Sequence, residues 1–231
     1  MIRPVSLLIS LLLFASVAQD VRKVTSAFDS RYNHARTLKA IFFESYRDGK
    51  GGVSADSGTV YFSKPGRMRW DYDSPEKKLF LVDGTNVWFY VPADRTVSRA
   101  KLSESSDWRT PLALLAGKTD LSKLCRSIEP ADPSSFPSEK SADALSPPNT
   151  TTLRCLPRES PESEEIHDVL LAIDPHGFLT RILIEQAGDA STEFRFGNWE
   201  ENLAIPEAQF HFDPPPGVAV VDEQALAGTL R

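Results

Sequence analysis

The side chains best suited to catalysis are few and widely separated in this sequence. The 231 residues include four histidines, His34, His167, His176 and His211, and none has the HExxH spacing of a zinc protease. The sequence has no G-x-S-x-G nucleophile elbow, phosphate-binding loop or dinucleotide fingerprint. The acidic residues are dispersed and show no glycosidase couple. We therefore expect no enzyme active site, no cofactor, and structural or solvated roles for the histidines.

The two cysteines, Cys125 and Cys155, are expected to form a disulfide in an oxidising compartment. A bridge that closes about 30 residues stabilises a fold by ~3–4 kcal/mol in the chain-entropy description. Two cysteines at this spacing, with no nearby histidine pair, do not make a metal-ligand set. Two buried free thiols are the alternative.

The N-terminus has the pattern of a secretory signal peptide. Arg3 precedes an apolar run over residues 5–17, and Ser16 and Ala18 are small residues at the cleavage positions. A membrane anchor is the alternative, but the run is short of the ~20 residues that span a bilayer. We expect residues 1–18 to be removed and residues 19–231 to form one soluble periplasmic domain. The net charge of the full sequence is −6, and loss of Arg3 with the signal peptide makes the mature chain −7, which argues against nucleic acid as a partner.

Apolar spacing predicts a helix over residues 20–38, because Val21, Val24, Phe28 and Tyr32 fall on one helical face. A short helix is predicted at 110–117, and a flexible loop at about 130–150, where Pro, Ser, Ala and Asp dominate. Strands are predicted at 58–63, 67–73, 78–82, 86–91, 97–102, 121–128, 151–156, 166–173, 178–186, 192–199 and 218–221. This order predicts an α+β fold with a large antiparallel sheet.

Three of these strands are apolar on both faces, at residues 79–82, 87–91 and 169–173. An antiparallel sheet with one solvated face should alternate between apolar and polar residues. Two explanations remain open. Either other segments cover the second face and complete a filled core, or that face lines an apolar cavity that holds a ligand.

Residues 58–92 resemble the outer-membrane lipoprotein carrier family (LolA). The similarity lies in Gly58, Phe62, Lys64-Pro65, Arg67, Arg69-Trp70, Tyr72, Ser74-Pro75, Asp83-Gly84 and Trp88-Phe89-Tyr90. Residues 110–115 resemble the family's lid helix, and residues 210–218 resemble its closing segment. The similarity is weak from about 118 to 165.

The resemblance implies an incomplete, unclosed antiparallel β-barrel with a helical lid enclosing a hydrophobic cavity. It also implies a monomeric periplasmic carrier that transports lipoproteins from the inner to the outer membrane by binding their acyl chains. The partners would be an inner-membrane ABC exporter and, in many species, an outer-membrane acceptor lipoprotein. The candidate cavity and lid residues are Met68, Trp70, Tyr72, Leu81, Trp88, Tyr90, Leu112 and Leu115. The sequence does not indicate which strand face points inward.

Lys64 occupies a position where the family commonly has an arginine that is linked to lid closure and transfer. Lysine keeps the charge but lacks the planar, bidentate donor geometry of arginine. Arg67 and Arg69 are alternatives for that role, and a solvated charge at a strand end is the simplest explanation for Lys64.

Four other functions can be weighed against the sequence. A carrier of another lipid or glycolipid, or an envelope sensor of lipids or lipoproteins, would have the same fold. The anchored acceptor of the same pathway would need a lipidated cysteine after the signal peptide, and none is present there. An enzyme acting on lipids or glycans would need a nucleophile and a base, which the sequence does not show.

Overall fold

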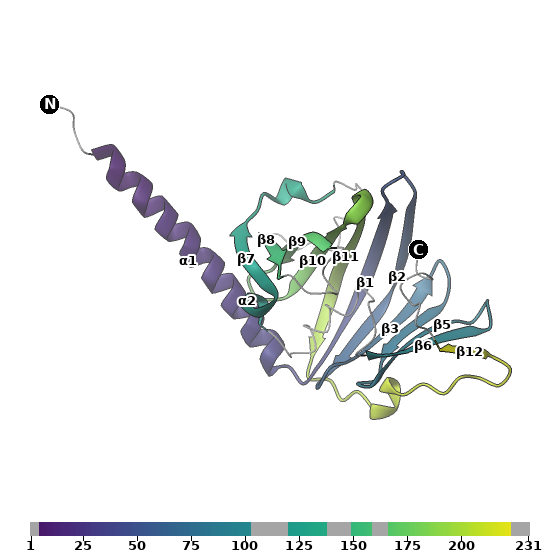
Figure 1. The fold of residues 1–231 in the computed structure, drawn as a ribbon. Helices are drawn as coiled ribbons and strands as arrows, with labels where there is room; N and C mark the ends of the chain where they lie inside the picture. The colour runs from purple at the N-terminus through teal and green to yellow at the C-terminus, as the bar shows by residue number, and fades with distance from the viewer. Residues whose placement is uncertain (1–4, 103–119, 138–148, 159–165, 223–231) are drawn as a thin grey trace.

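The structure is a computed structural model that describes residues 5–102, 120–137, 149–158 and 166–222 (Figure 1). These residues form one 12-stranded sheet, accompanied by two α-helices and three short 3-10 turns. The elements are α1 (Val5–His34), β1 (Thr37–Asp48), β2 (Val53–Ser63), β3 (Arg67–Ser74), β4 (Lys78–Val82), β5 (Asn86–Val91), β6 (Thr96–Lys101), α2 (Leu121–Leu124), β7 (Cys125–Pro130), η3 (Pro133–Ser135), β8 (Thr151–Pro157), β9 (Ile166–Ile173), β10 (Leu179–Gln186), η6 (Ala187–Asp189), β11 (Ala190–Glu201), η7 (Glu207–Phe210) and β12 (Ala219–Asp222).

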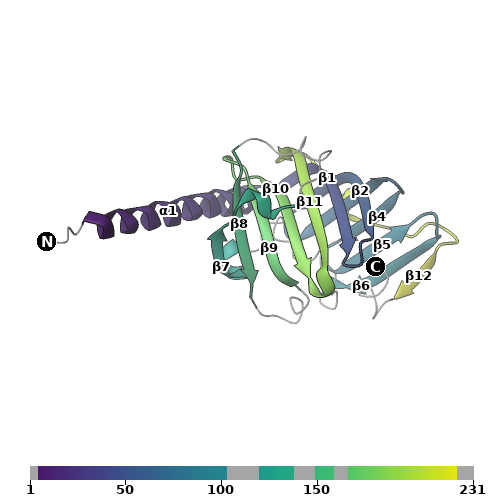
Figure 2. The same cartoon turned by 90° about the horizontal axis from the view of Figure 1, so that it is seen from above.

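The sheet consists of two meanders that are joined by one long-range strand pair. Strands β1 to β6 form the first meander and β7 to β11 the second, and β1 pairs antiparallel with β11. Strand β12 adds to β6 in the parallel direction, whereas all the other pairs are antiparallel. The sheet curves strongly, and its end strands β12 and β7 do not pair with each other (Figures 1 and 2). The prediction of an unclosed, mainly antiparallel barrel is confirmed, while the predicted lid helix at 110–117 lies outside the described residues.

Most predicted strands agree with the structure to within a few residues, but the predicted bounds of two elements are wrong. The helix predicted to reach Leu38 ends at His34, because Leu38, Ala40 and Phe42 already alternate towards the core as part of β1. The strand predicted at 121–128 begins only at Cys125, and Leu121–Leu124 is the helix α2. The backbone N–H of Leu121 donates to the Asp29 carboxylate at 3.0 Å, which satisfies the first turn of α2 from a distant part of the chain.

The C-terminal half of α1 packs against the sheet through Phe28 and Tyr32, which are 1 % and 2 % exposed. The Tyr32 hydroxyl accepts the backbone N–H of Leu179 at 3.0 Å, and the indole of Trp199 donates to the carbonyl of Leu179 at 2.8 Å. Burial raises the pKa of the Tyr32 phenol, so this group stays neutral at ordinary pH. Within the described residues, no helix combines the length and apolar character that a bilayer crossing requires.

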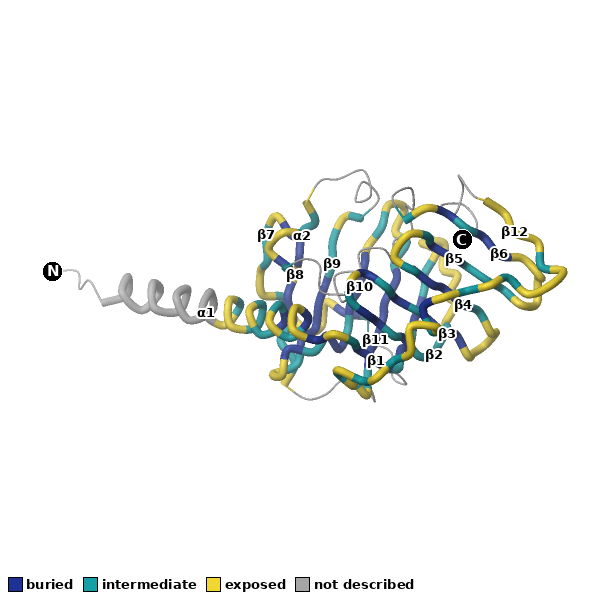
Figure 3. Tube along the Cα trace, turned by 90° about the horizontal axis from the view of Figure 1, so that it is seen from below, coloured by how far each residue is buried: buried dark blue, intermediate teal, exposed yellow. Residues whose placement is uncertain are grey.

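The two ends of the sheet differ in how they are covered. Near one end, α1 and α2 both contact the end strand β7. At the other end, β12 is exposed along its whole length, and Val220 and Val221 are each 45 % exposed (Figure 3).

The strands that are apolar on both faces are covered by other segments on the face opposite α1. Phe210 of η7 packs on Leu79 and Leu81 of β4. Phe136, which follows η3, packs on Leu170, Ala172 and Leu183. The described part of the loop predicted at 130–150 therefore contributes to the core rather than lying wholly on the surface. For this face the filled-core explanation holds.

Beside Phe136, two arginines share one buried carboxylate. The guanidinium groups of Arg181 and Arg195 lie 2.5 and 2.7 Å from the carboxylate of Glu193, and Arg195 is 1 % exposed. Arg181 also stacks on the Phe136 ring at 4.2 Å, which fixes the covering segment to the sheet.

The β4–β5 hairpin is organised by the carboxylate of Asp83. Its Oδ1 accepts the backbone N–H groups of Thr85 and Asn86 at 2.8 and 2.7 Å, and its Oδ2 accepts the Trp88 indole at 2.8 Å. Partial burial acts to raise the pKa of Asp83, but these hydrogen bonds together outweigh it and hold the pKa below its usual value. Because the pKa of Asp83 is lower in the folded than in the unfolded protein, its carboxylate stabilises the fold at pH values above the unfolded-state pKa.

We expect Asp83→Ala to lower the free energy of unfolding by about 1–3 kcal/mol at pH 7, because it leaves several donors unpaired. The difference from the wild type should shrink as the pH falls below the usual aspartate range and through the lowered pKa of Asp83. Chemical denaturation monitored by tryptophan fluorescence measures both effects. Asp94→Ala, at an exposed residue of the next turn, is the control, and equal losses in the two variants would refute the role of Asp83.

Candidate functional site

The sheet has two distinct faces with different side chains. We call the face that contacts α1 the inner face and the opposite one the outer face. The inner face holds an aromatic cluster from four strands, and its members are Phe42, Phe62, Trp70, Phe194 and Phe196. The ring centroid of Trp70 lies 4.8 Å from that of Phe42 and 5.2 Å from that of Phe194. Edge-on and tilted contacts of this kind form a dense apolar surface.

The structure divides the predicted cavity residues between the two faces. Met68, Trp70 and Tyr72 alternate along β3 and all lie in the inner-face core. Leu81, Trp88 and Tyr90 belong to a second cluster on the outer face, with Phe210 and Phe212 of the C-terminal segment. Leu112 and Leu115 lie outside the described residues. The sequence pattern could not assign the faces, because both faces of β4 and β5 are apolar.

The outer-face cluster is partly covered and partly open. Phe212 contacts Trp88 and Tyr90, with ring centroids 5.7 and 5.4 Å apart. Beside it is an open groove of about 570 Å³. Its lining mixes apolar and charged side chains and includes Tyr61, Arg69, Asp71, Leu79, Tyr90 and Phe212. The mixed lining and open shape do not provide an enclosed apolar site.

Lys64 lies at the C-terminal end of α1, not on either aromatic cluster. Its Nζ donates to the backbone carbonyl of Asn33, in the last turn of the helix. A cation at this position is favourable, because the C-terminal carbonyls of a helix carry partial negative charge. Partial burial lowers the pKa of Lys64 below its usual value. The contact therefore connects the β2–β3 turn to α1.

The two alternative arginines both point to the outer face. Arg67 lies over the Phe210 ring at 5.3 Å. Arg69 pairs with Asp71 at 2.8 Å and donates to the carbonyl of Gln209 at 3.0 Å. Both side chains therefore help to hold the C-terminal segment on the sheet.

A polar group of the inner face was not identified from the sequence. Glu44 of β1 accepts the phenol O–H of Tyr72 at 2.8 Å, although Glu44 is only 9 % exposed. The strand pattern contained a signal for it, because residue 44 continues the inward alternation of Leu38, Ala40 and Phe42. A carboxylate at such a position has to be hydrogen-bonded.

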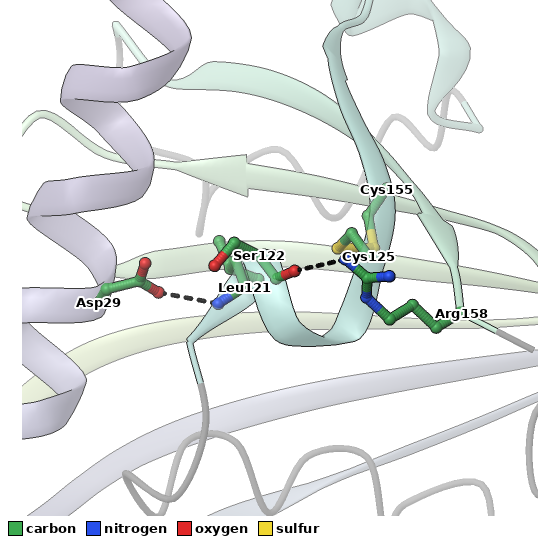
Figure 4. Close-up of a disulfide and its surroundings, with 6 residues drawn as sticks. All are labelled: Asp29, Leu121, Ser122, Cys125, Cys155 and Arg158. Atoms are coloured by element: carbon green, nitrogen blue, oxygen red, sulfur yellow. Dashed lines mark hydrogen bonds between the residues drawn. A yellow bond between two sulfur atoms is a disulfide. The ribbon is translucent and has the colours of Figure 1, made fainter. Parts of the chain in front are cut away.

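The disulfide and α2 fix α1 beside the end of the second meander (Figure 4). Cys125 and Cys155 are bonded, and they connect β7 to β8. Arg158 donates to the carbonyl of Ser122, and Asp29 accepts the N–H of Leu121. Burial raises the pKa of Asp29, while the hydrogen bond from Leu121 acts in the opposite direction. No group of three or more potential metal ligands occurs in the described ranges.

Sequence comparisons relate this chain to a known family. The family described as "Outer membrane lipoprotein carrier protein LolA" matches residues 33–136. The outer-membrane lipoprotein carrier protein of Pseudomonas paraeruginosa is 32% identical over 197 residues, which cover 83% of this chain and 84% of that protein. This chain belongs to the outer-membrane lipoprotein carrier family. The carrier protein of Nitrosospira multiformis is 29% identical over 82% of this chain and 84% of its own length.

The fold also occurs among solved structures. The crystal structure of an uncharacterized conserved protein from Thermus thermophilus aligns with a TM-score of 0.50 at 10% identity. The alignment covers 88% of this chain and 99% of that protein, so the similarity concerns the fold alone. In this member of the carrier family, the inner aromatic face is the candidate binding surface.

We expect the double substitution Cys125→Ser and Cys155→Ser to lower the free energy of unfolding by ~3–4 kcal/mol, because it releases a loop of about 30 residues in the unfolded chain. Denaturant titration of the variant against the oxidised wild type measures the loss. The reduced wild type should behave like the variant. If the variant unfolds at the same denaturant concentration as the oxidised wild type, the bridge has no stabilising role.

Proposed function

We propose that this protein is a periplasmic carrier that binds the acyl chains of lipoproteins on its inner face and transports them from the inner to the outer membrane. The observation that carries this proposal is the aromatic inner face in a chain of the lipoprotein carrier family. Each acyl CH₂ removed from water contributes about 0.8 kcal/mol, so a surface of this kind can hold several chains without a polar contact.

The packing of the inner face suggests how cargo could be released. Met68, Trp70 and Phe194 are nearly fully buried against neighbouring side chains. Acyl chains therefore have to compete with the protein's own contacts for the same apolar surface. Such competition makes binding a balance between two packed states, which a carrier can shift without hydrolysing a nucleotide itself.

The finer steps of transport extend this proposal. Residues 1–18 direct secretion and are removed, an ABC exporter in the inner membrane delivers the lipoprotein, and an outer-membrane acceptor receives it.

Met68, Trp70 and Tyr72 are proposed to contact the acyl chains, while Leu81, Trp88 and Tyr90 support the outer face. Leu112 and Leu115 remain predicted lid contacts. Lys64 remains a predicted transfer residue, and its contact with Asn33 gives it a route to α1.

The direct test is release of lipoproteins from spheroplasts by the purified protein. We expect radiolabelled lipoproteins to appear in the supernatant as a soluble complex with the protein. Organic extraction of the complex should yield the diacylglyceryl-modified N-terminal fragment. Recovery of phospholipid or glycolipid alone would favour a carrier of another lipid, and failure to release any lipoprotein would refute the proposed function.

Two neighbouring residues of β2 provide a matched pair for locating the site. Val60 is fully buried on the inner face, whereas Tyr61 lines the outer groove. We expect Val60→Phe to reduce lipoprotein release several-fold, because the added ring occupies volume that acyl chains need. Tyr61→Phe should release lipoproteins like the wild type. Thermal unfolding of both variants checks their folding, and equal release by the two would place the acyl site elsewhere.

A further inference from the structure

The inner face is not apolar along its whole length. At the end where β1 finishes and β4 starts, four polar side chains occupy it, namely Glu44, Asp56, Tyr72 and Lys78. Glu44 lies directly opposite Asp56 in the β1–β2 ladder, and Tyr72 lies opposite Lys78 in the β3–β4 ladder. Residues that face each other across a ladder project to the same side of a sheet. We call these four residues the polar quartet.

The quartet is linked by short contacts at the border of the core. The Tyr72 hydroxyl donates to Glu44 at 2.8 Å, and the Lys78 ammonium lies 2.6 Å from the Asp56 carboxylate. The Lys78 ammonium also lies 5.3 Å from the centre of the Tyr72 ring. Glu44 and Tyr72 are buried, whereas the side chains of Asp56 and Lys78 are 16 % and 21 % exposed. The quartet therefore extends from the core towards solvent.

A second observation points to a hydrogen-bonding ligand at this end. Trp70 is fully buried, and its indole Nε1 has no hydrogen-bond acceptor among the described residues. Trp70 and Tyr72 both pack against the same ring, that of Phe42, at 4.8 and 5.0 Å. A buried donor without an acceptor is costly and uncommon in proteins. An ester carbonyl of a bound lipid is an acceptor of suitable size and polarity for this position.

We propose that the polar quartet and Trp70 form the subsite for the glyceryl ester region of the cargo, and that the subsite selects lipids without a phosphate next to the acyl chains. This inference rests on the proposed carrier function and adds an orientation and a selectivity to it. The acyl chains lie along the aromatic cluster towards α1, and the ester region lies at the quartet, where the Trp70 N–H donates to a carbonyl oxygen.

The charges of the quartet provide the selectivity. It contains two carboxylates and one ammonium group, and the exposed residues Glu76 and Lys77 of the adjoining turn add one charge of each sign. A phosphate placed here would face Glu44 and Asp56 at short range in a partly desolvated site. Juxtaposition of like charges is among the strongest penalties in recognition. A thioether-linked diacylglycerol has no such charge, so it is accepted where phosphatidylglycerol is disfavoured.

The test compares two lipids with identical palmitoyl chains, an S-dipalmitoylglyceryl-cysteinyl peptide and dipalmitoylphosphatidylglycerol. Dissociation constants come from tryptophan fluorescence of the purified protein at low ionic strength. We expect the wild type to prefer the lipopeptide by at least about tenfold. The double substitution Glu44→Gln and Asp56→Asn should reduce this preference about tenfold, mainly through tighter binding of phosphatidylglycerol.

Asp71→Asn is the matched control, because Asp71 precedes Tyr72 on β3 but projects to the outer face. It should keep the wild-type preference. Asp56→Asn alone, at the more exposed carboxylate, should reduce the preference for the lipopeptide by about twofold or more. This single variant tests the inference if the double variant does not fold. Trp70→Phe should weaken binding of both lipids, because both contain ester carbonyls.

The outcomes separate the selectivity from the carrier function. If the wild type binds the lipopeptide but both carboxylate variants keep its preference, the selectivity is refuted and the carrier function stands. If the wild type binds neither lipid, the carrier function itself is refuted, and the inference fails with it.

Discussion

The pairing of β1 with β2 on one side and with the distant strand β11 on the other is the constraint on which the rest of this structure depends. β1 pairs along nearly its whole length with β2 on one side and with β11 on the other. This arrangement brings Phe42 of β1 together with Trp70 of the first meander and Phe194 of the second, and these two rings also contact each other. A shift of one residue in either ladder would turn a whole strand over. The aromatic cluster and the position of Glu44 beside Tyr72 both follow from this single register.

Under the proposed function, the two faces of the sheet divide stability and binding between them. On the outer face, Phe136 and Phe210 cover the apolar residues of β9 and β4 from segments that cross the sheet. On this face Arg181 and Arg195 bind the buried carboxylate of Glu193, and Arg69 binds the C-terminal segment. The outer face can therefore keep the sheet intact while side chains on the inner face exchange partners. A binding protein whose site lies in its main core needs such a second core.

The sequence predicted the strands well wherever local alternation decided them. β3 and the β4–β5 hairpin were predictable because Met68, Trp70 and Tyr72 alternate and because Asp83-Gly84 forms a tight turn. Gly58 was recognised from the family pattern, and the structure gives its reason, since a side chain there would overlap the carbonyl of Asp71. α2 was missed because Asp29, distant in sequence, satisfies its first turn. The division of the candidate residues between two faces depends on the covering segments, and local patterns do not contain that information.

The unequal coverage of the sheet's ends has a consequence for self-association. At β7 the margin is shielded by α1 and α2, and Pro130 lacks the N–H group that a further strand would need. At β12, in the part of the chain that the structure describes, the margin carries two exposed valines, and its one ladder is the one with β6. Unprotected edge strands are the places where proteins polymerise or bind extended peptides. A strand from another chain can therefore extend this sheet by pairing with β12, but not by pairing with β7. Because the β7 edge is covered, molecules cannot add to both edges and form a continuous sheet.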